Sequence, residues 1–145
     1  MRGLLDINVL IALADADHSF HERAHAWYGK NKRSGWASCP LTENGMVRIM
    51  THPNYHPGIR YSAEEIISLL ETFSQGSDHA FWVDDLSLLD RKLFKRERIL
   101  GSRQVTDIYL LALAAKHGGR LVTFDEGINT AAVRRFTADK LCIIP

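Results

Sequence analysis

Short apolar runs alternate with amphipathic stretches along this chain, and the alternation predicts the order of its elements. Five runs have the length and composition of strands: residues 3–5, 36–38, 80–83, 120–123 and 141–144. Helical periodicity marks the stretches between them: from about residue 7, then 18–30, 40–51, 62–73 and 106–116. Apolar strands that alternate with helices are typical of an α/β fold, in which helices cover both faces of a central parallel sheet.

Local signals support several of the helix boundaries. Pro40 suits the first turn of a helix, and the His52-Pro53 pair ends the same helix. Ser62 is followed three residues later by Glu65, which is a capping-box pattern. Gly118-Gly119 ends the last helix.

The composition indicates an ordinary globular protein. With 145 residues, 46% of them hydrophobic and 24% charged, the chain is expected to form a single domain over residues 1–145. Cys39 and Cys142 form neither a disulfide framework nor a zinc-binding pattern, so a reducing cytoplasm is expected. The apolar run 4–14 is too short for a membrane span and lacks the features of a signal peptide. We therefore expect a cytoplasmic protein without a membrane partner.

Acidic residues occupy unusual positions in this pattern. Asp6, Glu43 and Asp107 each precede apolar residues at i+3, i+4 and i+7, so each acid shares the buried face of its predicted helix. Asp125 follows the strand 120–123. For any one acid, capping and the helix dipole are an equally good explanation. Capping alone does not require the acid to lie on the apolar face.

A divalent metal site explains all four acids together. The carboxyl ends of parallel strands meet at one edge of a sheet, so residues distant in sequence can converge there. Unpaired buried carboxylates are costly unless cations neutralise them, and oxygen ligands favour Mg²⁺ or Mn²⁺. Such ions clamp a scissile phosphate and activate water, so a phosphodiester is the expected substrate.

Three neutral residues accompany these acids. Asn8, Thr106 and Thr123 can orient carboxylates or water without adding charge. Local roles remain equally open, because Thr106 can cap its helix and Asn8 can bond to the backbone.

The acid-bearing segments resemble those of the PIN domain, and more narrowly those of VapC-type toxins. The resemblance runs nearly end to end and is carried by residues 4–10, 40–49, 105–112 and 121–125, which read LLDINVL, PLTENGMVRI, VTDIYLLA and LVTFD. It implies a three-layer PIN-like fold and an acidic quartet of Asp6, Glu43, Asp107 and Asp125. The acid at position 125 is the least uniform in such toxins, so its role is the weakest to transfer.

The resemblance also implies an activity and partners. Proteins of this type are metal-dependent endoribonucleases, the toxin components of type II toxin-antitoxin systems. They are usually homodimers, and a small cognate antitoxin holds them inactive. The alternative is a binding or signalling module that has a metal-dependent acidic pocket but no hydrolytic activity.

Other patterns give competing or additional hypotheses. The spacing of His21 and His25 can hold zinc, but a packed helix face is the better interpretation without a third ligand. Asp84-Asp85 is similar to the acidic pocket of a receiver domain, yet the chain lacks a suitable late lysine. The three tryptophans, Trp27, Trp36 and Trp82, are expected in the core rather than against RNA bases.

Basic residues supply the expected contacts to RNA. The net charge of +1 cannot hold a polyanion by the global field, so a local cationic surface is needed. The segment 91–98 carries five basic residues and one acid, and Lys92, Lys95, Arg96 and Arg98 are its candidate phosphate ligands. Arg48 is a further candidate, which either contacts a phosphate or pairs with a metal-binding acid.

Overall fold

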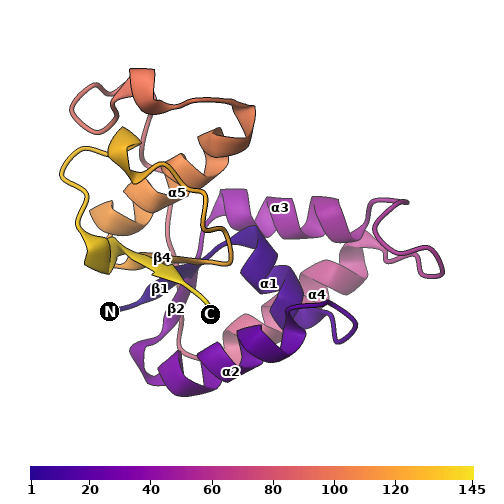
Figure 1. Ribbon diagram of the computed structural model, residues 1–145. Helices are drawn as coiled ribbons and strands as arrows, with labels where there is room; N and C mark the ends of the chain where they lie inside the picture. The colour runs from indigo at the N-terminus through magenta and orange to yellow at the C-terminus, as the bar shows by residue number, and fades with distance from the viewer.

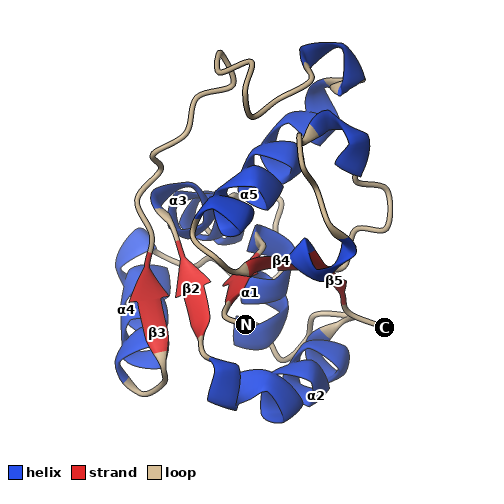
Figure 2. Ribbon diagram, turned by 90° about the vertical axis from the view of Figure 1, so that its left-hand side faces the viewer, coloured by secondary structure: helices blue, strands red, loops and turns tan.

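The computed structural model describes residues 1–145 and contains a five-stranded, entirely parallel sheet. Its strands are β1 (Gly3–Leu5), β2 (Trp36–Ser38), β3 (His79–Phe81), β4 (Arg120–Thr123) and β5 (Leu141–Ile143). They are arranged in the order β3-β2-β1-β4-β5, which makes β1 the central strand. Figure 2 shows the arrows of β2 and β3 pointing in the same direction. The predicted α/β class and parallel sheet are confirmed.

Helices lie on both faces of this sheet. They are α1 (Ile7–Ala14), α2 (His21–Asn31), α3 (Pro40–Met50), α4 (Ala63–Gln75) and α5 (Val105–Lys116). Figure 1 shows α5 on one side of the strands and α1, α2 and α4 on the other. Side chains alternate along β1, so Leu4 packs in the cluster that contains α5, while Leu5 packs in the cluster that contains α1.

Two predicted boundaries differ from the structure by a few residues. The strand predicted at residues 80–83 is β3, which ends at Phe81 because its partner β2 ends opposite it at Ser38. The helix predicted from residue 18 begins at His21, because the His18 ring accepts a hydrogen bond from the Phe20 amide and holds a turn there. No helix has the length and apolar character needed to cross a membrane.

The topology places β1 and β4 side by side with their carboxyl ends at one edge. Leu5 lies opposite Val122 in the register of this pair. The residues that follow the two strands, Asp6 after β1 and Asp125 after Thr123 of β4, are therefore brought to the same edge.

Candidate metal centre

Asp6 joins the central strand to the first helix. It is only 4% exposed, and its Oδ1 accepts a hydrogen bond from the Ile7 amide at 2.7 Å as the N-cap of α1. Burial raises the pKa of Asp6, and the charge of Asp125 acts in the same direction, although the hydrogen bonds from Thr123 and Ile7 oppose the shift. Capping and the acidic cluster are therefore both properties of this one carboxylate.

Thr123 connects the residues around Asp6. Its hydroxyl donates to Asp6 Oδ2 at 2.7 Å and accepts from the Asp125 amide at 3.1 Å. Asn8 Nδ2 also lies within hydrogen-bond distance of this hydroxyl, at 3.4 Å. Asn8 and Thr123 thus stand beside Asp6, where the sequence analysis expected them. The Asn8 Oδ1 atom is buried and has no hydrogen-bond partner.

Asp107 reaches the same place from the first turn of α5. Burial raises its pKa to about 7, and the Asp6 charge, a hydrogen bond with Asp125 and the Asp125 charge add to the effect. Asp6 and Asp125 thus lie close enough to Asp107 for their charges to act on it, although 101 and 119 positions separate Asp6 from the other two. A proton on Asp107 or a bound cation would relieve this repulsion near neutral pH.

Glu43 stands apart from these three acids in its hydrogen bonds. On α3, its Oε1 accepts from the Ser38 hydroxyl at 2.5 Å, and His79 Nε2 lies 2.8 Å from the same hydroxyl. Since Ser38 has one hydroxyl proton and donates it to Glu43, His79 Nε2 must carry a proton and donate to Ser38. A chain of two hydrogen bonds thus fixes the Glu43 carboxylate.

Sequence reasoning missed Ser38 and His79. Ser38 ends the predicted strand 36–38, so a polar residue at a strand end was a usable signal. His79 lay just outside the strand predicted at 80–83, and only the pairing of β3 with β2 brings it to Ser38.

The other sequence-predicted residues near the acids have separate surroundings. Thr106 makes no side-chain hydrogen bond. It lines a groove together with two residues of its own helix, Val105 and Tyr109, and three from other segments, Leu41, Asp84 and Leu88. Arg48 is exposed and forms no ion pair with Glu43, but both line a hollow of about 450 Å³ beside α4. Arg48 is thus free to meet an anion there.

The four acids have the chemistry of a site for a hard cation. None of them forms an ion pair with a basic side chain. The acidic partners in the four ion pairs of the protein are Asp78, Asp85 and Asp139. As the side chains stand, no group of three or more Asp, Glu, His or Cys residues is placed so that it could hold a metal ion. The uncompensated carboxylates and the unpartnered, buried Asn8 Oδ1 are all oxygen ligands, which Mg²⁺ and Mn²⁺ prefer. The donor atoms of these residues therefore fit such an ion in their chemistry.

The basic segment predicted to bind RNA is divided in two. Lys92 and Lys95 line one hollow together with Arg91 and two arginines from near the end of the chain. Arg96 and Arg98 do not line it; they lie, exposed, on the 3₁₀ turn Arg96–Arg98.

The residues behind the competing hypotheses have structural roles. The rings of His21 and His25 donate to the carbonyls of Ala12 and Leu13, at 2.7 and 2.9 Å, so they fasten α2 to α1 rather than hold zinc. Asp85 pairs with Lys116 and His117.

The tryptophans belong to the packing of the fold. Trp27 and Trp36 are buried, as predicted, at 9% and 1% exposure. Trp82 is half-buried and stacks on His117 with ring centroids 4.9 Å apart. None of the three is arranged as an exposed platform for RNA bases.

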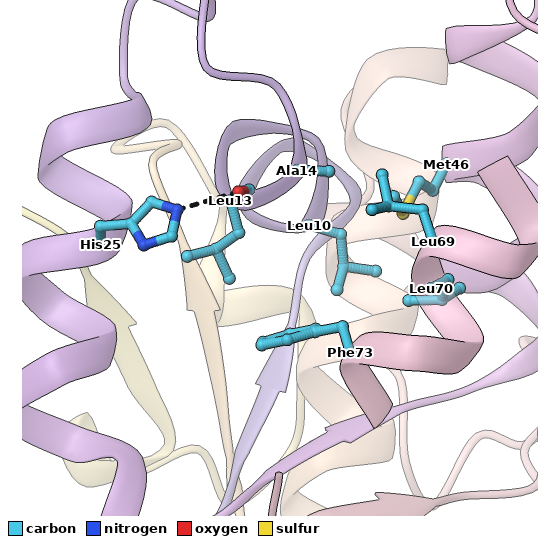
Figure 3. Close-up of a pocket in the computed structure, with 8 residues that line it drawn as sticks. All are labelled: Leu10, Leu13, Ala14, His25, Met46, Leu69, Leu70 and Phe73. Atoms are coloured by element: carbon cyan, nitrogen blue, oxygen red, sulfur yellow. Dashed lines mark hydrogen bonds between the residues drawn. The ribbon is translucent and has the colours of Figure 1, made fainter. Parts of the chain in front are cut away.

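An apolar cavity of about 150 Å³ lies between α1, α2, α3 and α4. Figure 3 shows Phe73 and Leu70 from α4 pointing toward Leu10 of α1, with His25 beyond Leu13. Leu70 also lines the hollow that contains Glu43 and Arg48, so the apolar cavity and that hollow are neighbours.

Known proteins resemble this chain over most of its length. Residues 3–133 match the PIN domain family. The chain is 46% identical over 144 residues to Ribonuclease VapC44 of Mycobacterium tuberculosis, which covers 99% of this chain and 100% of that protein. It is also 45% identical over 133 residues to Ribonuclease VapC38 and 39% identical over 132 residues to Ribonuclease VapC39 of the same species; these alignments cover 92% and 91% of this chain and 92% and 94% of those proteins.

Proposed function

This chain belongs to the PIN domain family and, within it, to the VapC-type ribonucleases, and we propose that it is the toxin of a toxin-antitoxin pair that cleaves RNA with Mg²⁺ or Mn²⁺. The observation that carries the metal dependence is the meeting of Asp6, Asp107 and Asp125 without a basic partner. Membership of a ribonuclease family disfavours the alternative of a non-catalytic binding module. An RNA substrate also fits a cytoplasmic location.

The four acidic residues have different proposed roles as metal ligands. We assign Asp6 and Asp107 as the principal metal ligands, with Asp125 and Glu43 binding directly or through water. A bound ion would lower the pKa of a water molecule and stabilise the charge that develops on the scissile phosphate.

The neighbouring polar side chains act on these ligands. Thr123 fixes the Asp6 carboxylate through its hydroxyl, and Asn8 presents a free amide oxygen beside it. Ser38 and His79 fix Glu43 on the neighbouring strand pair. Such neighbours commonly hold ligands within the narrow geometry that catalysis needs. Thr106 and Arg48 remain candidates for contacts to the substrate.

The test of this function is cleavage of RNA in the presence and absence of metal. The wild type is expected to cleave RNA with Mg²⁺ or Mn²⁺ and to stop when EDTA is added. Asp6→Asn and Asp107→Asn should each lower the rate at least 100-fold, because each removes a charged ligand. Arg33→Ala is the control, because Arg33 is exposed in the turn that precedes β2 and so lies at the opposite edge of the sheet from these acids. Wild-type rates in both Asn variants would refute the assignment.

We also propose that a small antitoxin binds across α3 and α4 of a homodimeric toxin. The apolar cavity suits an apolar side chain of the partner. On α4, Leu69 of the cavity and Ile67 of the adjoining hollow are 43% and 53% exposed. From there the adjoining hollow leads to Glu43. An arginine of the partner would be attracted by the uncompensated carboxylates.

Co-purification tests this partner. The toxin expressed with its neighbouring short reading frame should form a complex in which RNA cleavage is suppressed at saturation. Size-exclusion chromatography with light scattering should give a toxin dimer in the complex. A saturated complex with undiminished cleavage would contradict the proposed inhibition.

A further inference from the structure

Two segments far apart in sequence form one rigid basic surface. Phe94 and Val133 are paired in an antiparallel bridge, and both are buried. The Lys95 amide donates to the Ala132 carbonyl at 2.8 Å, and the Arg134 amide donates to the Leu93 carbonyl at 2.9 Å. The buried bridge therefore fixes the backbone on which the neighbouring basic side chains stand.

A hollow of about 640 Å³ opens on this surface, and five of its six lining residues are basic: Arg91, Lys92, Lys95, Arg134 and Arg135. We call it the basic hollow. No residue of the basic hollow forms an ion pair. The chain has 18 basic and 17 acidic residues, so the other 13 basic and 17 acidic residues leave the rest of the protein with a net charge of −4. The positive charge is thus concentrated in one place.

Two arginines are held in defined positions. Arg134 Nε donates to the Arg91 carbonyl at 2.7 Å, which leaves both Nη groups without a protein partner. Arg135 has a φ of 58°, and it is the only residue other than glycine with a positive φ. That conformation is unfavourable for a residue with a side chain, and glycine would adopt it with less strain. Arginine at position 135 therefore introduces backbone strain that glycine would not.

A network of hydrogen bonds joins this surface to the acidic residues. The Gly127 amide donates to Asp125 Oδ1 at 2.6 Å, and the Gly127 carbonyl accepts from Gln104 Nε2 at 2.9 Å. Gln104 Oε1 accepts from the Asn129 amide, and Asn129 Nδ2 donates to the Arg98 carbonyl at 2.8 Å. The Arg98 amide in turn donates to the carbonyl of Lys95 at 2.9 Å, so the chain of hydrogen bonds runs from Asp125 to a residue of the basic hollow.

We propose that the basic hollow binds backbone phosphates of RNA away from the bond that is cleaved. This inference rests on the proposed function, because it takes RNA as the substrate. Arginine and lysine donors without partners are suited to phosphate oxygens, and a local cationic surface is needed where the remainder of the protein is acidic. Contacts to phosphates carry no sequence information, so the basic hollow should increase the affinity for RNA of any sequence.

The experiment compares two triple variants with the same change in charge. Lys92→Ala, Lys95→Ala and Arg135→Gly remove charge from the basic hollow, and the glycine removes the strain at position 135. Lys30→Ala, Lys32→Ala and Arg33→Ala remove exposed charge from the end of α2 and the turn after it. Binding to single-stranded RNA oligonucleotides of unrelated sequence is measured in EDTA over a range of salt concentrations, so that no cleavage is involved.

The hollow variant should bind every oligonucleotide at least tenfold more weakly than the wild type. Its log–log salt dependence should become shallower by about 2, since each phosphate contact on a single strand contributes about 0.7. Arg135→Gly alone should melt no lower than the wild type, which separates lost binding from lost folding. The control variant should keep most of the affinity.

Two results would overturn the proposal: a hollow variant that binds RNA like the wild type, or a control variant that loses as much affinity. Failure of the proposed function would look different. A wild type that binds RNA through the basic hollow but does not cleave it with metal would remove the activity and leave the binding site in place.

Discussion

At the scale of single residues, the carboxylates at the carboxyl ends of β1 and β4 are held in an environment that disfavours their charge. Asp6 is almost completely buried, and Asp107 is partly buried beside it. Only neutral donors, the Thr123 hydroxyl and the Ile7 amide, oppose the rise in the pKa of Asp6. Without metal, these residues therefore destabilise the fold when they ionise.

This gives a prediction for the pH dependence of stability in EDTA. The pKa of Asp107 is about 7 in the fold and 3.8 as the ordinary value, so the unfolded chain loses its proton first as the pH rises. The free energy of unfolding should fall between about pH 4 and 7, by about 1–2 kcal/mol after allowance for the partial exposure of Asp107, and then level off. Urea unfolding at several pH values measures this. Asp107→Asn should show a smaller fall; an equal or larger fall in this variant would contradict the assignment to Asp107.

At the scale of elements, the crossing of α1 and α3 sets the spacing between Asp6 and Glu43. Gly45 of α3 is buried against Ile7 of α1. A methyl group on Gly45 would contact Ile7 Cδ1 and approach Ile7 Cγ1 to 2.8 Å, which is closer than real contacts of this kind. Glycine at position 45 thus allows the two acid-bearing helices to approach each other.

Gly45→Ala should therefore destabilise the protein by about 1–2 kcal/mol, because overpacking exceeds the gain in helix propensity. Cleavage should also decrease, since α3 must shift relative to α1. Gly29→Ala is the matched control: it lies in α2 with nothing within 4 Å of the added methyl group, so it should be neutral or stabilising. Adding Ile7→Ala to Gly45→Ala should recover part of the packing loss. Thermal unfolding of the wild type and these three variants tests this. A Gly45→Ala variant as stable as the wild type would show that α1 and α3 can accommodate the added methyl group.

At the scale of the whole molecule, opposite charges are separated although their sum is near zero. The uncompensated acids gather at one edge of the sheet, and the basic hollow lies on the surface built from residues 91–95 and 134–135. A cation bound among the acids removes their repulsion only in the folded state, so it should stabilise the fold as a whole.

Addition of Mg²⁺ or Mn²⁺ should therefore raise the melting temperature of the wild type. At about 100 times the dissociation constant the gain is about 2.7 kcal/mol, which corresponds to roughly 5–10 °C for a chain of this size. Asp6→Asn and Asp107→Asn should show much smaller increases, measured by scanning fluorimetry at matched ionic strength. Equal increases in all three proteins would place the bound ion elsewhere.

The sequence by itself determined the helices and strands, and it singled out most of the acids as candidate site residues. Strands as apolar as residues 3–5 and 120–123 have to be buried on both faces, and this requirement gives the parallel sheet and its helical layers. The same requirement draws attention to Asp6 and Asp107, because a carboxylate on a buried, apolar helix face is costly unless a proton or a cation neutralises it.

Only the tertiary structure decided which groups meet. Asp6 and Asp107 interact because β1 lies beside β4 and α5 packs over them, and no local signal states that pairing. The link from Glu43 through Ser38 to His79 depends on the pairing of β2 with β3. The basic hollow depends on the bridge between Phe94 and Val133, which joins residues 39 positions apart. Contacts of this kind arise from packing between segments distant in the chain, whereas periodicity and capping report only on residues within a few positions of one another.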